Sequence, residues 1–131
     1  IIEWINNSDK RIRYSGNWKC YFLENQELSL KITKGCFESD LHRAMNNGET
    51  VFVAFEGSVL EIYARGGATL FIDGVNVGRI DCSNESNGRR NLAFTSINLH
   101  GGWHTLYMVA DENFDFDALR IIRQAKRAFC N

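Results

Sequence analysis

The 131-residue chain has no proline, no excess of charge of either sign and no long hydrophobic run. Fifteen basic and sixteen acidic side chains give a formal net charge of −1, so the chain lacks the positive field that gathers nucleic acid. No apolar run approaches the roughly 20 residues that a helix needs to cross a bilayer. We therefore expect no nucleic-acid partner and no membrane insertion. The chain opens with IIEWINN and lacks a basic-then-apolar leader, so we expect a mature or excised piece of a larger protein.

Cysteines are few and widely spaced, with no C-x-x-C pair, which argues against a zinc knuckle or a thioredoxin-type redox pair. Structural thiols and disulfides both stay open, and an even count allows three pairings of two bridges. The triplets at 6–8 and 84–86 match the N-glycosylation motif, which is short enough to occur by chance. The four cysteines are Cys20, Cys36, Cys82 and Cys130.

Recognisable catalytic motifs are also absent. The sequence has no G-x-S-x-G elbow, no H-E-x-x-H and no glycine-rich phosphate loop, and its three histidines fall on separate segments. A set made of Ser15 or Ser39 with His42 and an aspartate is conceivable, but such side chains are far more often structural. We therefore predict no catalytic residue.

Short segments rich in β-branched and aromatic residues make up most of the chain, and glycine punctuates them. Apolar residues alternate within these segments, which is the period of a β-strand. Asp73-Gly74 supplies the positive φ angles of a tight hairpin turn. The pattern predicts one all-β domain, an antiparallel β-sandwich, with helical turns only in 39–48 and 123–131. The side chains expected to point inward are Val51, Val53, Phe55, Leu60, Ile62, Leu70, Ile72, Leu106, Met108, Leu119 and Ile121.

Five stretches follow one another in an order that resembles a known family: RYSGNW, LHRAMNNGETVFVAFEGSVLEIYA, ATLFIDGVNVG, LHGGWHTLYMVA and FDFDALRI. Together they look like the galactose-binding-like jelly rolls that occur as carbohydrate-binding modules and as accessory domains of glycoside hydrolases and esterases. The resemblance covers roughly residues 10–123. It implies a single jelly-roll domain over 1–131, an extracellular or cell-surface location, a polysaccharide or oligosaccharide ligand, and a multidomain parent protein.

Sugar binding needs flat aromatic faces for the apolar side of a pyranose and planar polar groups for its hydroxyls. Three loops offer both kinds of side chain, and in the related modules an asparagine just before the last strand, here Asn113, helps to build an apical site. Trp18 suits stacking and core packing equally, whereas Tyr14 is expected to pack and His42 suits a buried hydrogen bond as well as a ligand contact. The predicted carbohydrate-binding residues are Trp18, Tyr14, His42, Asn84, Arg89, Arg90 and Asn113.

Trp4 and Trp103 lie in strand-like contexts and are expected to pack in the core or on a sheet surface. Arg89 and Arg90 match the carboxylate of a uronic acid, although paired arginines on a glycine-rich loop are usually solvated.

Acidic residues cluster at 111–117, where hard carboxylate oxygens suit Ca²⁺. Resemblance to calcium-bearing sugar-binding modules pairs Glu3 with Asp117 as metal ligands. The alternative is a solvated turn, and the single acid of the N-terminal segment departs from the two closely spaced acids usual in that family. A structural calcium ion is therefore a possible cofactor, and none is certain.

The sequence as a whole favours a non-catalytic carbohydrate-binding module that targets an attached enzyme or surface protein to polysaccharide. A protein-interaction or adhesion sandwich is one alternative. An accessory jelly-roll domain of a carbohydrate esterase or glycosidase is another.

Overall fold

The computed structural model describes residues 1–22, 40–82 and 91–124, and within these ranges the secondary structure is β-strand. No helix in these ranges has the length and apolar character to cross a membrane. The strands are β1 (Ile2–Asn6), β2 (Arg13–Ser15), β3 (Trp18–Phe22), β4 (Asp40–Ala44), β5 (Glu49–Glu56), β6 (Val59–Ile72), β7 (Val75–Cys82), β8 (Leu92–Thr95), β9 (Trp103–Ala110) and β10 (Asp115–Ile122).

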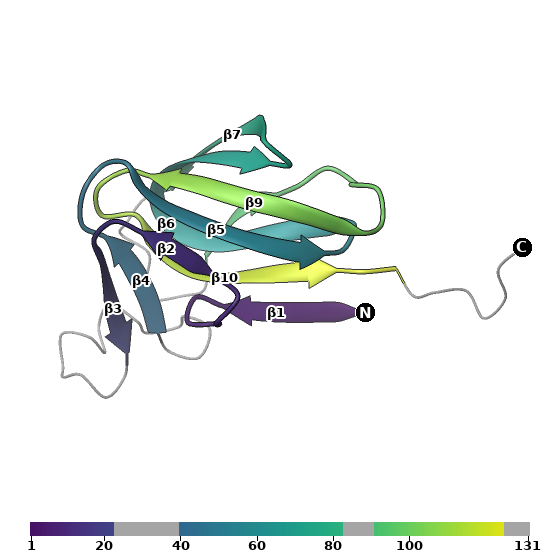
Figure 1. Ribbon diagram of the computed structural model, residues 1–131, viewed down its shortest axis with the longest axis horizontal. Coiled ribbons are helices and arrows are strands. Elements are labelled where there is room, and N and C mark those ends of the chain that lie inside the picture. The colour runs from purple at the N-terminus through teal and green to yellow at the C-terminus, as the bar shows by residue number, and fades with distance from the viewer. Residues whose placement is uncertain (23–39, 83–90, 125–131) are drawn as a thin grey trace, which may run out of the picture.

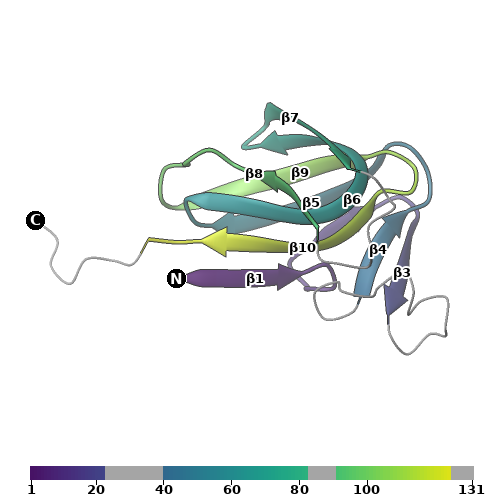
Figure 2. The same ribbon diagram turned by 180° about the vertical axis from the view of Figure 1, so that it is seen from behind.

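All strand pairs are antiparallel and form two layers that share β6 (Figure 1). One layer runs β2-β5-β9-β6-β7. The other layer contains β3, β4, β10, β1, β8 and the first half of β6. Figure 2 shows the whole domain from behind, with these strands labelled. Strand β6 changes layers around Gly66, whose φ of 94° favours glycine. The predicted antiparallel β-sandwich is confirmed.

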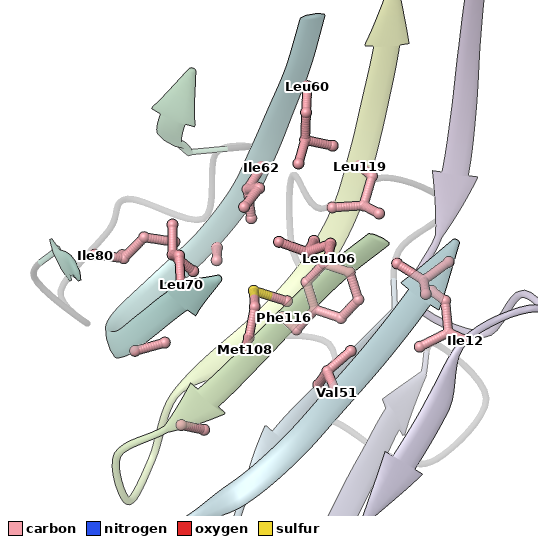
Figure 3. Packing of buried hydrophobic residues seen from close by; sticks show 14 of the residues in the cluster. Ile12, Val51, Leu60, Ile62, Leu70, Ile80, Leu106, Met108, Phe116 and Leu119 are labelled. Atoms are coloured by element: carbon pink, nitrogen blue, oxygen red, sulfur yellow. The ribbon is translucent and has the colours of Figure 1, made fainter. Parts of the chain in front are cut away.

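The core lies between the two layers (Figure 3). All eleven side chains predicted to point inward are buried, none more than 4% exposed. Directly opposed residues of neighbouring strands share a face of the sheet. Met108 of β9 lies opposite Val51 of β5 and Leu70 of β6, and all three face the core. Their chain neighbours consequently face outward.

The turn at Asp73-Gly74 joins β6 to β7 as predicted, with Ile72 paired to Val75. The φ angles of Asp73 and Gly74 are 52° and 78°, which is the left-handed conformation of a type I′ hairpin at both positions. Gly78, at φ 120°, lies beside an irregularity in the same ladder, so it serves a β-bulge.

The prediction of a helical turn within 39–48 is wrong, because residues 40–44 form β4. Leu41 and Ala44 are both buried and three residues apart, a spacing that is typical of a helix. In the structure they are packed in different clusters, Leu41 with Tyr21 and Ala44 in the main core. Pairing with β3 and β10 on either side fixes the strand.

The structure describes one of the two glycosylation triplets and two of the four cysteines. Asn6, the acceptor of the first glycosylation triplet, is 8% exposed, and its amide donates to Ser8 and Asp40. That amide is unavailable to a glycosyltransferase in the folded chain. Cys20 and Cys82 are free thiols, whereas Cys36, Cys130 and the second triplet lie outside the described residues.

Candidate functional site

Trp18, the first residue of β3, and the loop that carries Asn113 meet at one end of the sandwich. Trp18 lies opposite Ala44 in the ladder of β3 and β4, and the backbone N–H of Asn113 donates to the carbonyl of Ala44 at 2.8 Å. Asn113 is exposed and holds a φ of 67°, which asparagine tolerates better than most residues. The two residues thus share the end where the apical site is expected, and sugar binding there stays a prediction.

The indole of Trp18 serves two purposes at once. It is half-buried against the main core, and its Nε1–H donates to the carbonyl of Ser15 at 3.1 Å. Trp18 therefore combines the two alternatives that the sequence left open, since part of the ring packs and part reaches solvent.

Tyr14 and His42 belong to an internal hydrogen-bonded cluster around Asn7, which is fully buried. The Tyr14 hydroxyl donates to the carbonyl of Asn7 at 2.5 Å, and His42 Nδ1 lies 2.6 Å from Asn7 Oδ1. Because the Asn7 amide nitrogen donates to Asp40, its oxygen is an acceptor and His42 Nδ1 carries the proton. Burial raises the pKa of Tyr14 well above its ordinary range. Burial lowers the pKa of His42, against the opposing charge of Asp40.

Asn84, Arg89 and Arg90 lie outside the described residues. The segments that flank them are described: Cys82 pairs with Gly66, and the side chain of Asn91 donates to the carbonyl of Ala64 at 2.8 Å.

Glu3 and Asp117 lie on the paired strands β1 and β10 but are not opposite each other. Glu3 lies opposite Ile121 in the ladder of β1 and β10, and Asp117 is four residue steps, or about 13 Å, from Ile121 along β10. The carboxylate of Glu3 instead accepts from Arg11 at 3.0 Å and from Arg123 at 2.8 Å. The calcium site stays an untested prediction.

Two of the remaining acids of 111–117, Asp111 and Asp115, form ion pairs with different arginines. Asp115 is buried and forms a two-pronged ion pair with Arg43, at 2.6 and 2.8 Å. Asp111 pairs with Arg79 at 2.5 Å. These pairings favour a structural role for both carboxylates.

An aromatic row, whose residues are not among the predicted site residues, crosses the outer face of the β2-β5-β9-β6-β7 layer. Phe52 lies opposite Tyr107 in the ladder of β5 and β9, and Tyr107 lies opposite Phe71 in the ladder of β9 and β6. Arg13 and Asn76 continue the row on β2 and β7. Directly opposed residues point to the same side of a sheet, so all five side chains stand on one face and span about 19 Å.

The rings of this row are accessible to solvent. Phe52 is 39% and Tyr107 is 38% exposed, and the rings of Phe71 and Tyr107 contact each other with centroids 5.8 Å apart. Trp103, 65% exposed, stands on the same face four residues, or about 13 Å, from Tyr107. We call Phe52, Phe71, Trp103 and Tyr107 the outer aromatic face.

Polar side chains flank this face. Thr50 and Thr69 lie opposite Val109 in the next row of the same layer, and Thr105 lies between Trp103 and Tyr107. Hydroxyl groups beside flat rings match the mixture of polar and apolar groups that a sugar presents.

A second polar cluster lies at the start of β9. His104 is 2% exposed, its Nδ1 lies 2.6 Å from Asp73 Oδ2, and its Nε2 lies 2.7 Å from the carbonyl oxygen of His100. Burial by itself lowers the pKa of His104, but the hydrogen bonds to Asp73 and His100 outweigh it, so the pKa lies above its ordinary value. His104 and Asp73 resemble the base and orienting acid of a catalytic triad. A catalytic base would have to accept the proton of a nucleophile on Nε2 of His104. That nitrogen is instead hydrogen-bonded to the carbonyl of His100.

The conceivable serine set is not assembled in the described residues, because His42 is bonded to Asn7 and stacked on Tyr14. Ser39 lies outside those residues.

Neither a known protein family nor a curated protein matches the sequence. Solved structures do match. A family two carbohydrate esterase from Cellvibrio japonicus superposes with a TM-score of 0.64 at 11% identity, over 95% of this chain and 34% of that chain. A two-domain esterase active on acetylated mannans, co-crystallised with mannopentaose, gives a TM-score of 0.61 at 15% identity, over 96% and 38%.

The CBM36-1 domain of a multidomain xylanase, from the hindgut metagenome of Trinervitermes trinervoides, matches over its whole length. The TM-score is 0.56 at 13% identity, over 96% of this chain and 100% of that domain. This chain spans about a third of the two esterases. It therefore shares the β-sandwich fold of a carbohydrate-binding module and of parts of carbohydrate-active enzymes, and at these identities the likeness shows the fold alone.

Proposed function

We propose that this domain is a non-catalytic carbohydrate-binding module that binds polysaccharide across its outer aromatic face. The observation that carries the proposal is the alignment of the exposed Phe52 and Tyr107 with the partly exposed Phe71 in one row on the outer face. Aromatic rings exclude water from the apolar C–H face of a pyranose, and the neighbouring threonines suit its hydroxyls. With Arg13 and Asn76 at its two ends the row spans about 19 Å, which favours an extended chain over a single sugar.

Such a module acts by raising a local concentration. Tethering raises the effective concentration of an attached catalyst at its polymer even when each sugar contact is weak. This role requires a larger parent protein and an extracellular setting, and both belong to the proposal. The carbohydrate-related structures with this fold support it.

The apical end with Trp18 and Asn113 is the rival binding place. Its support is that Trp18 and Asn113 both contact Ala44, one in the strand ladder and one by a backbone hydrogen bond. Against it, the rings of Tyr14 and His42 are stacked on each other and hydrogen-bonded to Asn7, which favours an internal role for both.

Affinity electrophoresis against a broad panel of soluble polysaccharides tests the proposal. The binding module must be retarded by at least one polymer, and an unrelated protein of similar size must not be. If no polymer retards the domain, the proposal is wrong, and an accessory sandwich of an esterase or an adhesion domain becomes the better account. The first of these has its own support, since the chain covers about a third of two esterases.

A further inference from the structure

Three side chains from separate elements meet beside the start of β9. Asp73 comes from the β6–β7 turn, His100 from the loop after β8, and His104 from β9 itself. Their metal-ligating atoms all lie within 4.8 Å of one another, and in the described part of the chain no other three His, Cys, Asp or Glu side chains do so. The imidazole rings of His100 and His104 lie 4.4 Å apart, centroid to centroid.

Each of the three side chains has one atom that is hydrogen-bonded to a neighbouring backbone group. Nε2 of His104 faces the carbonyl of His100 at 2.7 Å, and Nδ1 of His100 faces the carbonyl of Gly101 at 3.0 Å. A carbonyl only accepts, so both of these nitrogens carry hydrogen. Oδ1 of Asp73 accepts from the backbone N–H of Thr105 at 2.9 Å. This leaves Nδ1 of His104, Nε2 of His100 and Oδ2 of Asp73 as the atoms that a metal ion can use.

That arrangement is the one that protein metal sites use. A histidine ligand almost always donates its other N–H to a carbonyl or carboxylate, and a ligating carboxylate is itself hydrogen-bonded. Two imidazole nitrogens and one carboxylate oxygen suit divalent transition ions such as Zn²⁺ and Ni²⁺ rather than Ca²⁺, which prefers oxygen. We propose that Asp73, His100 and His104 form a binding site for a divalent transition-metal ion.

Binding exchanges a proton for the metal. The proton now shared between His104 Nδ1 and Asp73 Oδ2 leaves to solvent, and the ion takes its place between the two atoms. Zn–N bonds of about 2.0–2.1 Å place tetrahedral ligands about 3.3 Å apart, so the exposed loop carrying His100 closes in slightly. Because Asp73 and His100 are exposed, the ion enters directly from solvent. Three protein ligands leave the fourth position open.

Isothermal titration of the full domain with Zn²⁺, in a reducing buffer that contains no chelator, tests the site. We expect one ion per chain. Losing even an outer-shell partner costs roughly 10–100-fold in metal affinity, so His100→Ala and Asp73→Asn should each weaken binding at least about tenfold. Asp73→Asn keeps an oxygen for Thr105 and tolerates the positive φ of the turn, so it preserves the fold.

His42→Gln is the matched control, since it removes a histidine elsewhere and should leave Zn²⁺ affinity unchanged. Ring NMR signals of His100 and His104 should shift on titration, while those of His42 should not. Two outcomes overturn the proposal: no Zn²⁺ binding up to millimolar concentration, or equal binding by wild type and His100→Ala. The second outcome would assign the ion to other groups, such as the free thiols of Cys20 and Cys82.

Discussion

Tyr14 lies flat on His42, with ring centroids 4.2 Å apart and planes inclined by only 9°. Both side chains are hydrogen-bonded to Asn7, one to its carbonyl and one to its side chain. The pair therefore ties β2 and β4 to the turn after β1, and its two rings stack on each other. Two residues of the predicted sugar site are thus part of the internal scaffold.

Tyr14→Phe should destabilise the domain without changing polysaccharide binding. The substitution keeps the ring stack but leaves the carbonyl of Asn7 without this donor, and an unsatisfied buried polar group costs about 1–3 kcal/mol. Urea denaturation monitored by fluorescence measures the loss. Unchanged stability together with lost retardation by polysaccharide would contradict the structural role of Tyr14.

His42 should titrate below its ordinary pKa of 6.5, because burial disfavours the imidazolium and outweighs the attraction of Asp40. Between the folded and the unfolded pKa the unfolded chain binds more protons. The contribution of His42 to stability is therefore fully present above about pH 6.5 and is lost as the pH falls toward the folded pKa. NMR titration of the ring gives that pKa directly.

His42→Gln supplies the reference for this effect, since glutamine keeps a donor but does not titrate. As the pH falls below 6.5, the unfolding free energy of the wild type should fall more than that of His42→Gln. A ring pKa above 6.5 would contradict the account.

Gly74→Val should lower stability by about 1–3 kcal/mol, which is the cost of holding a side chain in the left-handed region. A Cβ at Gly74 meets nothing within 4 Å, so backbone strain at φ 78° is the sole cause. Gly101→Val is the matched control, because its surroundings are equally open and its φ lies outside the left-handed region. If Gly74→Val and Gly101→Val lower the melting temperature equally, the strain argument is wrong. Polysaccharide binding should be the same in both variants.

The sequence predicted the core well, because alternation within a strand depends on local residues alone. Val51, Val53 and Leu70 follow that period and are buried. The Asp73-Gly74 turn was equally readable, since few dipeptides favour positive φ at both positions. Strand β4 was missed because pairing on both edges overrides a helix-like spacing of Leu41 and Ala44.

The candidate sites were harder to predict. Alternation places Phe52 on the outer face, but its alignment with Tyr107 and Phe71 depends on the register between strands far apart in the sequence. The same holds for Asp73 and His104, which are 31 residues apart. The one signal available beforehand was the set of aromatic residues that alternate with core positions.

The affinity of Tyr107→Ala and Phe52→Ala for a polysaccharide that retards the wild type tests the central claim most directly. Removing an aromatic anchor commonly costs about 2 kcal/mol or more, which is roughly a thirtyfold weaker Kd, while the fold survives because both rings are exposed. Ile97→Ala, which truncates an apolar side chain that is 82% exposed and lies outside the outer aromatic face, should bind like the wild type, as should Trp18→Ala. If Tyr107→Ala and Phe52→Ala keep wild-type affinity and Trp18→Ala loses it, binding occurs at the apical end and the account is contradicted.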